Sequence, residues 1–325
     1  MSFRLLILTE GISDLGDESL IDEWPSKLKT LIPDIEVYLI DSVNEAESII
    51  EHVDAAFGYI GPDLFEKAIN LKWIQGPQAG PKAGFYHKPM MDSEVIVTNA
   101  RGIFNDHIST HIMSYVLAFS RSLNIYMSGQ LKREWKSAQP TKHLPETTAL
   151  IVGVGGIGGE TAKHCTSFGM TVLGIDARLK TAPTGVKELH RPESLNDLLP
   201  QADFVIVTVP ETPRTQSLFT KKQFQLMKSS SYFINIGRGA TVSLDHLTDA
   251  LNRGEISGAA LDVFEVEPLP NDHALWSMPN VIITPHIAGL GPYLDQRREE
   301  LFFDNCLRFN RGEMLRNIVD KKNWF

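Results

Sequence analysis

Residues 149–159 read ALIVGVGGIGG, in which the pattern Gly153-x-Gly155-x-x-Gly158 directly follows an apolar run. A strand, a glycine loop and a helix (expected over 160–168) in this order form a site for the pyrophosphate of a dinucleotide. Gly153 permits the tight turn, Gly155 lets the backbone approach the phosphates, and Gly158 lets the helix pack closely. The helix N-terminus adds N–H groups and the positive end of its dipole. The stretch therefore predicts a Rossmann-type nucleotide site.

An acidic residue, Asp176, ends the next apolar run at the distance from the loop where NAD-binding proteins hold the adenosine ribose. A carboxylate there accepts hydrogen bonds from the ribose hydroxyls and repels a 2′-phosphate, so NAD is favoured over NADP. Arg178 and Lys180 follow closely and keep NADP open, because an arginine can receive the phosphate. A methyltransferase that uses adenosylmethionine has a similar loop and acid, and is an alternative at this point.

Working outward from the loop, short apolar runs alternate with helix-like segments, which predicts parallel sheets covered on both faces. The strands expected before the loop are 3–9, 36–40, 55–60, 71–75 and 94–98. Those expected from the loop onward are 149–152, 171–175, 204–209, 232–236, 259–263 and 281–284. The fold class is therefore α/β, with two series of strands.

Between the two series lies a periodic apolar segment, 106–128, which predicts one long helix connecting two domains. Asn105 or Asp106 is its expected N-cap, and Gly129 its expected end. The segment that follows, 130–148, is polar and contains two prolines, so we expect an extended arm on the surface. A last helix is expected over 293–310.

Composition narrows the class of protein. The 325 residues are 42% hydrophobic and 22% charged, as in globular domains, and the formal net charge is −9. This charge argues against general binding to nucleic acids or anionic membranes. Cys165 and Cys306 are too far apart in sequence to indicate a disulfide framework, and no leader or apolar run of membrane-spanning length is seen. We expect a cytoplasmic protein with no nucleic-acid or membrane partner.

Three ionisable residues come just after three successive strands of the second series: Arg238, Glu267 and His286. The carboxyl ends of parallel strands line one crevice, so the fold brings these side chains to the edge where the glycine loop lies. A cation, an acid and a histidine there can bind an anionic carbonyl compound and move one proton. Glu265 is two residues from Glu267 and competes for the role of the acid.

At this point the chain, from about 98 to 289, resembles the D-isomer-specific 2-hydroxyacid dehydrogenase family. The matching strings are TNARGIF (98–104), GVGGIG (153–158), VPETPRT (209–215), NIGRG (235–239), ALDVFEVEP (260–268) and TPHIAG (284–289). The resemblance implies hydride transfer between NAD and a 2-keto or D-2-hydroxy acid. Glyoxylate and hydroxypyruvate are the expected kind of small substrate.

The resemblance also implies roles for individual residues. Arg238 binds the substrate carboxylate, His286 is the acid and base, and Glu267 is its partner; these three form the expected catalytic set. The backbone N–H groups of Ala79 and Gly80 are expected to bind substrate as well. The expected cofactor-binding residues are Gly153, Gly155, Gly156, Ile157, Gly158, Asp176, Arg178, Pro210, Ile236, Gly237, Asp262, His286 and Gly289.

The implied fold is two α/β domains around a cleft. Residues 1–100 and 288–325 form a flavodoxin-like, substrate-binding domain, and 101–287 form the NAD-binding Rossmann domain. The arm 130–148 resembles the segment through which family members form homodimers. A transcriptional corepressor related to the family is the alternative function, since it senses a dinucleotide and recruits protein partners.

Two departures from the family pattern affect the substrate side. The loop 78–85 reads QAGPKAGF, where the family usually has Gly-Val-Asp, so Pro81 and Lys82 replace the familiar pair. Phe104 stands where many members have histidine. His107 and His111 have a spacing that can bind metal, but no third ligand is evident, and we expect no metal site.

Overall fold

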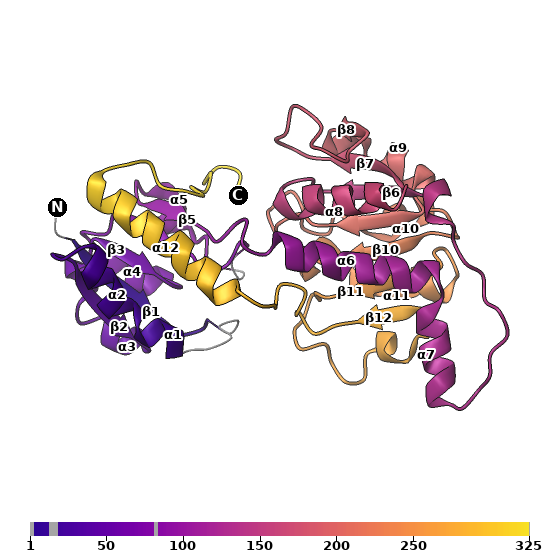
Figure 1. Cartoon of the computed structure of the whole chain (residues 1–325), viewed down its shortest axis with the longest axis horizontal. Coiled ribbons are helices and arrows are strands. Elements are labelled where there is room, and N and C mark those ends of the chain that lie inside the picture. Colours follow the sequence, from indigo (N-terminus) through magenta and orange to yellow (C-terminus); the bar gives the residue numbers. More distant parts are fainter. Residues whose placement is uncertain (1–2, 13–18, 81–83, 325) are drawn as a thin grey trace. The chain divides into compact units, whose positions relative to one another are not determined.

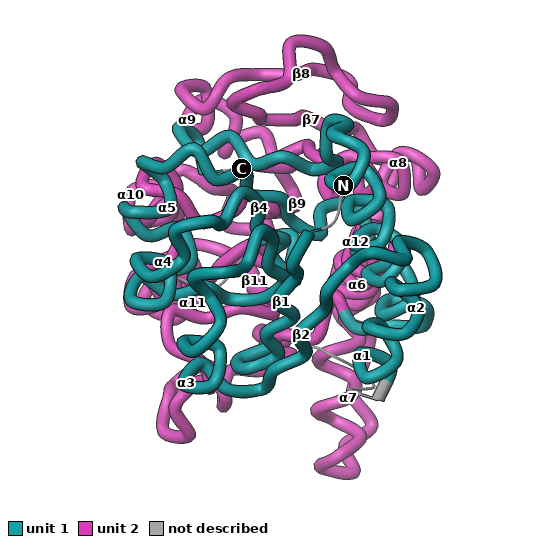
Figure 2. Tube along the Cα trace, turned by 90° about the vertical axis from the view of Figure 1, so that its left-hand side faces the viewer, with its two compact units in different colours: residues 1–104, 290–325 teal, residues 105–289 magenta. Residues whose placement is uncertain are grey.

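The computed structural model of the chain describes residues 3–12, 19–80 and 84–324. It consists of two compact units (Figures 1 and 2). Unit 1 comprises Met1–Phe104 and Leu290–Phe325, and unit 2 comprises Asn105–Gly289. Each unit is built on a parallel sheet, so the predicted α/β class is confirmed.

The sheet of unit 1 has the strand order β2-β1-β3-β4-β5. Its strands are β1 (Arg4–Leu8), β2 (Glu36–Ile40), β3 (Ala55–Phe57), β4 (Trp73–Gln75) and β5 (Ile96–Thr98). Its helices are α1 (Ser19–Asp22), α2 (Trp24–Leu31), α3 (Val43–Ala46), α4 (Pro62–Lys67), α5 (Lys88–Asp92) and α12 (Leu294–Arg311). Successive residues of β1 pack into two different cores: Leu5 and Ile7 join Trp24 of α2, while Leu6 joins Leu64 of α4. The sheet is therefore covered on both faces, as its continuous apolar strands require.

The sheet of unit 2 has the strand order β12-β11-β10-β9-β6-β7-β8. Its strands are β6 (Thr148–Val152), β7 (Thr171–Ile175), β8 (Glu188–His190), β9 (Phe204–Val207), β10 (Tyr232–Asn235), β11 (Gly258–Leu261) and β12 (Val281–Ile283). Its helices are α6 (Asn105–Ser120), α7 (Leu123–Leu131), α8 (Gly156–Ser167), α9 (Leu195–Leu198), α10 (Lys221–Leu226) and α11 (Leu244–Asn252). The strand order reverses between β6 and β9, and open α/β sheets bind ligands at the carboxyl ends of strands at such a switch point.

Short 3₁₀ helices lie in the connections of both units. They are η1 (Ile50–His52), η2 (Leu144–Glu146), η3 (Pro192–Ser194), η4 (Leu199–Gln201), η5 (Gly239–Thr241) and η6 (Ala274–Ser277).

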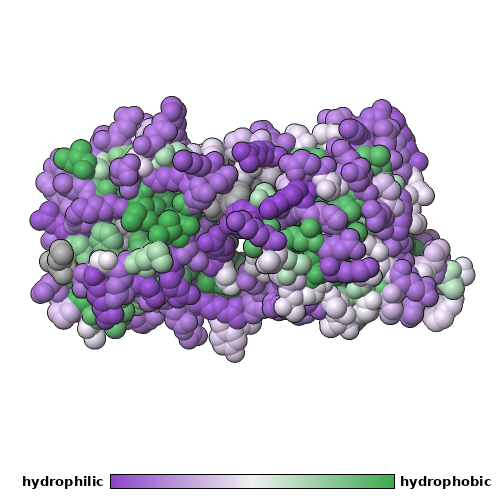
Figure 3. All heavy atoms as spheres, turned by 90° about the horizontal axis from the view of Figure 1, so that it is seen from above, coloured by the Kyte–Doolittle hydropathy of each residue, from purple (hydrophilic) through white to green (hydrophobic). Residues whose placement is uncertain are grey.

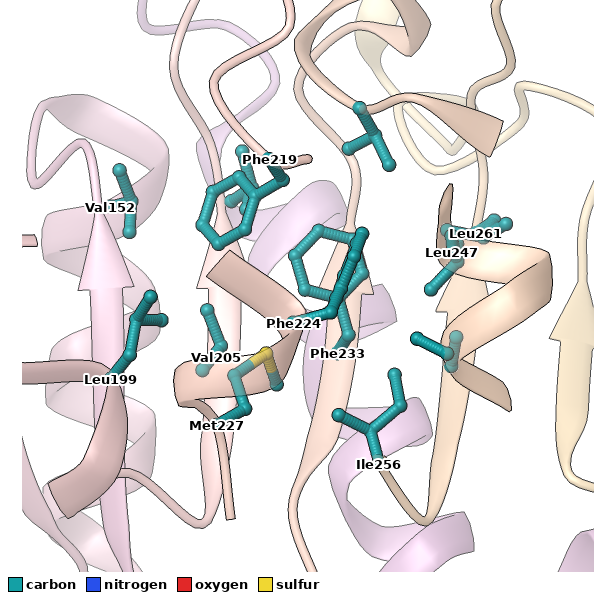
Figure 4. Close-up of a cluster of buried hydrophobic side chains, with 14 of the residues drawn as sticks. Val152, Leu199, Val205, Phe219, Phe224, Met227, Phe233, Leu247, Ile256 and Leu261 are labelled. Atoms are coloured by element: carbon teal, nitrogen blue, oxygen red, sulfur yellow. The ribbon is translucent and has the colours of Figure 1, made fainter. Parts of the chain in front are cut away.

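Unit 2 also has one apolar core on each face of its sheet. Ile151 of β6 packs with residues of α6 and α8, whereas its neighbours Leu150 and Val152 pack with residues of α9, α10 and α11. Figure 4 shows the second of these cores, in which the Phe233 ring centroid lies 4.9 Å from that of Phe219 and 5.3 Å from that of Phe224. On the face drawn in Figure 3 hydrophilic residues predominate, with patches of hydrophobic residues among them.

The single helix expected over 106–128 is wrong. The chain forms two helices, α6 and α7, which are separated at Ser122, a residue with a left-handed φ of 53°. The Ser122 hydroxyl donates to the carbonyl of Pro140, 2.6 Å away in the arm. This tertiary contact stabilises the break between the two helices. The apolar periodicity of the sequence does not reveal such a contact. Strand β8 was also not expected, because a run of three residues, ELH, has no apolar pattern.

A pair of adjacent glycines in α8 tests the packing of this helix against the glycine loop. A Cβ added at Gly158 would lie 2.0 Å from the Gly153 carbonyl oxygen, whereas one at Gly159 would lie 3.6 Å from the oxygen of Val154. Urea unfolding should show Gly158→Ala destabilised by about 1–3 kcal/mol, the usual effect of overpacking. Gly159→Ala should be neutral or stabilised, because alanine favours helices. Equal losses in both variants would contradict this account.

Candidate active site

The glycine loop between β6 and α8 has the geometry that a pyrophosphate requires. Gly153 has a φ of +98°, which favours glycine, and an added Cβ would lie 2.9 Å from the Val209 side chain. Gly155 is open: beyond its chain neighbours, the nearest atom to an added Cβ is Nη2 of Arg178, at 3.8 Å. The first N–H groups of α8, which begins at Gly156, have no acceptor within the helix. Loop and helix N-terminus therefore fit a dinucleotide phosphate.

Asp176 lies directly after β7 and is almost fully buried. Its Oδ1 accepts hydrogen bonds from the N–H groups of Arg178 and Leu179, at 2.8 and 3.0 Å. The turn that carries Asp176 is also bound by Arg191, whose Nη1 donates hydrogen bonds to the carbonyls of Asp176 and Ala177. One carboxylate oxygen thus shapes the turn, which leaves Oδ2 as the atom to face a ribose hydroxyl.

Sequence reasoning did not single out Arg191. It follows β8, and because β8 itself was not expected, nothing in the local pattern placed this arginine beside Asp176. The one signal that could have indicated it is its position: Arg191 follows β8, which lies next to β7, the strand that Asp176 follows.

The connections after β9 and β10 touch through their backbones. A Cβ at Gly237 would lie 2.6 Å from the Val209 carbonyl oxygen, so glycine is required for this close approach. Pro210 follows Val209, and its carbonyl accepts the Thr215 hydroxyl. Ile236 donates its N–H to Val207 and is buried. Pro210, Ile236 and Gly237 thus stand together at the carboxyl ends of neighbouring strands, while Gly289 is the last residue of unit 2.

The position of Arg238 is set by a second backbone contact. A Cβ added at Gly239 would lie 1.8 Å from the Phe264 carbonyl oxygen, so the loop after β10 lies against the loop after β11. Arg238 is half-buried and donates from Nη1 to the Gly237 carbonyl. A guanidinium can bind a carboxylate through two parallel N–H groups, which is the chemistry expected of Arg238.

Glu267 and His286 are joined by a hydrogen bond, with 2.7 Å between Glu267 Oε2 and His286 Nδ1. Glu267 Oε1 accepts the N–H of Phe264 at 2.9 Å, which fixes the carboxylate. Burial raises the pKa of Glu267. The hydrogen bonds from His286 and Phe264 and the charges of His286 and Arg238 lower the pKa by more than burial raises it, so the net shift is downward. The carboxylate is therefore ionised at neutral pH, and Nε2 of His286 is the ring nitrogen left for a substrate.

The structure separates Glu267 from its competitor. Glu265 Oε2 accepts the N–H of Leu244, 2.8 Å away, at the first residue of α11. A carboxylate at a helix N-terminus stabilises the helix through its free N–H groups and its dipole. Glu265 thus supports α11, whereas Glu267 contacts the histidine.

Asp262, expected beside the cofactor, is 1% exposed and directs its carboxylate at the loop that carries His286. Its Oδ1 accepts the N–H of Ile287, and its Oδ2 accepts that of Ala288, both at 2.9 Å. The Asp262 carbonyl accepts the N–H of His286 at 2.8 Å. These hydrogen bonds fix the backbone of the loop after β12 to Asp262.

The remaining expected substrate residues, Ala79 and Gly80, belong to unit 1. The Ala79 carbonyl accepts a hydrogen bond from Asn99 Nδ2 at 3.0 Å, and the preceding Gln78 carbonyl accepts the N–H of Ala100 at 3.0 Å. The loop up to Gly80 is therefore tied to the segment after β5. Pro81 and Lys82 lie outside the described residues, and Phe104 is buried.

Neither a metal cluster nor a membrane-spanning helix is found in the part of the chain that the structure describes. No three histidine, cysteine, aspartate or glutamate side chains there are grouped so as to hold an ion. No helix there combines the length and hydropathy needed to cross a bilayer.

Comparison with known proteins agrees with this geometry. Residues 113–288 match the family model described as D-isomer specific 2-hydroxyacid dehydrogenase, NAD binding domain. The chain is 33% identical over 271 residues to a glyoxylate reductase of Thermofilum pendens, covering 81% of this chain and 79% of that protein.

Two solved structures have a similar fold over essentially the whole chain. One is a D-isomer specific 2-hydroxyacid dehydrogenase of Xanthobacter autotrophicus in complex with NADPH and MES, with a TM-score of 0.85, 27% identity and full coverage of both chains. The other is an NADPH-dependent glyoxylate/hydroxypyruvate reductase of Sinorhizobium meliloti in complex with NADP and sulfate, with a TM-score of 0.82 and 26% identity. The alignment with the second covers 99% of this chain and 100% of that chain.

The Glu267–His286 pair generates a prediction about pH. The pKa of Glu267 lies below its usual range, so its negative charge faces the His286 ring at neutral pH and is lost only as the pH falls through that pKa. In Glu267→Gln the charge is absent at every pH, so kcat/KM should be lower than that of the wild type at neutral pH, and the acid limb that Glu267 gives the wild-type profile should disappear. Glu265→Gln is the control: its amide oxygen still accepts the Leu244 N–H, and its profile should match the wild type. A Glu267→Gln profile identical to that of the control would remove Glu267 from this role.

Proposed function

The chain belongs to the D-isomer specific 2-hydroxyacid dehydrogenase family, and from this premise we propose that Arg238, Glu267 and His286 carry its reaction. It is an NAD(P)-dependent oxidoreductase that transfers hydride between the nicotinamide and a 2-keto or D-2-hydroxy acid. The observation that supports the proposed residues best is the 2.7 Å contact between Glu267 and His286 at the carboxyl edge of the unit 2 sheet.

The two parts of the chain have different proposed tasks. Residues 101–287 form the proposed NAD-binding domain, and 1–100 with 288–325 the proposed substrate-binding domain, in which Ala79 and Gly80 contribute backbone N–H groups. The glycine loop and the free N–H groups of α8 support the first assignment. The hydrogen bonds that tie the loop 77–80 to Asn99 and Ala100 support the second, because a fixed loop presents its N–H groups in fixed directions.

For the cofactor, we favour NADH over NADPH. The phosphates would be held at Gly153, Gly155, Gly156, Ile157 and Gly158, and the adenosine ribose at Asp176. The negative charge of Asp176 disfavours a 2′-phosphate, and its Oδ2 is the oxygen left for a hydroxyl. Arg178 stands close to Gly155 and would receive a 2′-phosphate in NADPH. The remaining proposed cofactor residues are Pro210, Ile236, Gly237, Asp262, His286 and Gly289.

The chain's own residues perform the acid–base part of the reaction. The bound nicotinamide supplies the hydride in reduction and accepts it in oxidation. Arg238 binds the substrate carboxylate, which places the keto oxygen toward Nε2 of His286. The imidazolium donates its Nε2 proton to that oxygen as negative charge develops there, and Glu267 holds the ring by Nδ1 and stabilises the imidazolium. In oxidation the neutral imidazole takes the hydroxyl proton.

A panel of keto acids tests this function directly. Glyoxylate, hydroxypyruvate, pyruvate, phenylpyruvate and phosphohydroxypyruvate are each offered with NADH and with NADPH, and oxidation of the reduced cofactor is followed at 340 nm. We expect turnover of glyoxylate and hydroxypyruvate, with NADH preferred over NADPH. Tight cofactor binding without turnover of any acid would instead favour a dinucleotide sensor of the corepressor type.

Replacement of Arg238 tests the carboxylate contact. An ammonium is a point charge and does not reproduce the planar, two-pronged contact of a guanidinium, so Arg238→Lys should lose most of kcat/KM for the keto acid. The affinity for NADH, measured by fluorescence titration, should change little. Wild-type kinetics in this variant would rule out the proposed role.

We further propose that the protein is a homodimer joined through α7 and the arm after it. Leu123, Met127 and Leu131 recur every four residues, so they share one face of α7, and the arm adds Trp135. Leu131 is 88% exposed and Trp135 fully so. Figure 1 shows α7 extending away from the sheet of unit 2. An apolar stripe of this kind favours a second copy of the same surface across a two-fold axis.

The dimer proposal predicts a change of mass in solution. Leu131→Glu combined with Met127→Lys places charges in the proposed interface, and sedimentation equilibrium should then report a monomer. The control is Ile69→Glu, which charges a side chain 78% exposed in unit 1 and should leave the dimer intact. A monomeric wild type would refute the proposal.

A cytoplasmic location is also proposed. Both cysteines, Cys165 and Cys306, are free and buried, and burial raises the pKa of the Cys165 thiol to about 12. Unpaired thiols of this kind fit a reducing compartment.

A further inference from the structure

Next to the loop that carries His286 lies a chain of buried and half-buried polar side chains from three segments. His111 and Tyr115 stand one turn apart on α6, Thr284 follows β12, and Asp262 follows β11. Nε2 of His111 lies 2.8 Å from the Tyr115 hydroxyl and 3.2 Å from that of Thr284. The Tyr115 and Thr284 hydroxyls are 2.5 Å apart, and Thr284 lies 2.5 Å from Asp262 Oδ1. The proposed reaction uses neither His111, Tyr115 nor Thr284.

The number of protons fixes the direction of this chain. An ionised Asp262 can only accept, so the single proton of the Thr284 hydroxyl points to Oδ1. Thr284 must then accept from Tyr115, whose own proton is used in that bond. The Tyr115 oxygen therefore accepts from His111, which places a proton on Nε2. If Nε2 were the acceptor instead, no proton would lie between the oxygens of Tyr115 and Thr284.

The surroundings keep the first two members of the chain neutral. Burial lowers the pKa of His111, although the charge of Asp262 opposes this shift. Burial also raises the pKa of Tyr115, which is 3% exposed. A neutral imidazole with its proton on Nε2, followed by two hydroxyls, gives one continuous direction of donation that ends on the carboxylate.

The Asp262 carboxylate joins this chain of hydrogen bonds to the loop after β12. Besides Thr284, it accepts the N–H groups of Ile287 and Ala288, the two residues that follow His286. His286 itself has a φ of 55°, a left-handed conformation that residues other than glycine seldom adopt. Such a conformation persists only where the surrounding contacts impose it. Here they are the hydrogen bonds from the His286 N–H to the carbonyls of Asp262 and Thr284.

Helix α6 also touches the glycine loop. Its first residue, Asn105, lies against Gly156, where an added Cβ would meet the Asn105 side chain at 2.8 Å. Farther along the same helix, His111 and Tyr115 reach Thr284. One rigid element therefore contacts both the loop that would hold the pyrophosphate and the loop that holds the histidine.

We propose that His111, Tyr115 and Thr284 are positioning residues for His286: through Asp262 they set the direction of its imidazole for proton transfer. The inference rests on the proposed function of His286. It requires that His111, Tyr115 and Thr284 act on the rate of the chemical step more than on the binding of either reactant, because none of the three is among the residues proposed to bind cofactor or substrate.

The test compares Thr284→Val, Thr284→Ser and Tyr115→Phe. Thr284→Val keeps the shape of the side chain but removes the hydroxyl, and Tyr115→Phe removes the donor to it. Displacement of a reacting group by about 1 Å can reduce a rate by about 10²-fold, so a drop in kcat of roughly tenfold or more is expected in both variants. The KM of the keto acid and the dissociation constant of NADH should stay near those of the wild type. Thr284→Ser restores the hydroxyl and should recover most of kcat.

Tyr232→Phe is the control, because Tyr232 is a half-buried tyrosine of unit 2 and lies at the start of β10, at the opposite end of that strand from Arg238. It should keep wild-type kcat even if its melting temperature falls as far as that of Tyr115→Phe. The inference is overturned if Thr284→Val keeps wild-type kcat, or if kcat follows the melting temperature across all variants. Should Tyr115→Phe fail to fold, the Thr284 pair decides alone. A wild type without keto-acid turnover would refute the proposed function itself, which is a separate outcome.

Discussion

At the carboxyl edge of the unit 2 sheet, Gly158, Gly237 and Gly239 each let one segment of backbone lie directly against another. A Cβ at these positions would lie 2.0, 2.6 and 1.8 Å from a carbonyl oxygen. Because glycine has no side chain, α8 can pack closely on the glycine loop, and the loops after β9, β10 and β11 can contact one another. Arg238 stands between two of these glycines. The placement of the proposed site follows from this close packing.

Three carboxylates within six residues, Asp262, Glu265 and Glu267, differ in what they contact and therefore in what they do. Asp262 is buried and accepts hydrogen bonds from the loop after β12. Glu265 accepts the first N–H of α11. Glu267 accepts from Phe264 and His286, and these contacts outweigh the burial that opposes its charge. Its lowered pKa keeps it ionised at neutral pH, and its contribution to stability is lost only as the pH falls through that value.

Helix α6 contacts two segments that follow different strands, one after β6 and one after β12. It begins at the glycine loop and, farther along, reaches Thr284 beside the histidine loop. A helix contacts both because its residues are held at fixed spacing by its own backbone hydrogen bonds. The relation between the cofactor loop and His286 is therefore set by one element as well as by the sheet.

The sequence is enough to predict the α/β class, most strands and the nucleotide loop, because these depend on local patterns: apolar runs bounded by polar residues, and glycines at fixed spacing. It also indicated Arg238, Glu267 and His286 as candidates, since each follows a predicted strand. Tertiary structure was needed to distinguish Glu267 from Glu265, to separate α6 from α7 at Ser122, and to bring Arg191 to the carbonyl of Asp176. It alone brought His111 to Thr284, 173 residues away. Such contacts depend on strand order and loop path, which arise from the packing of the whole unit and leave no mark on the pattern of neighbouring residues.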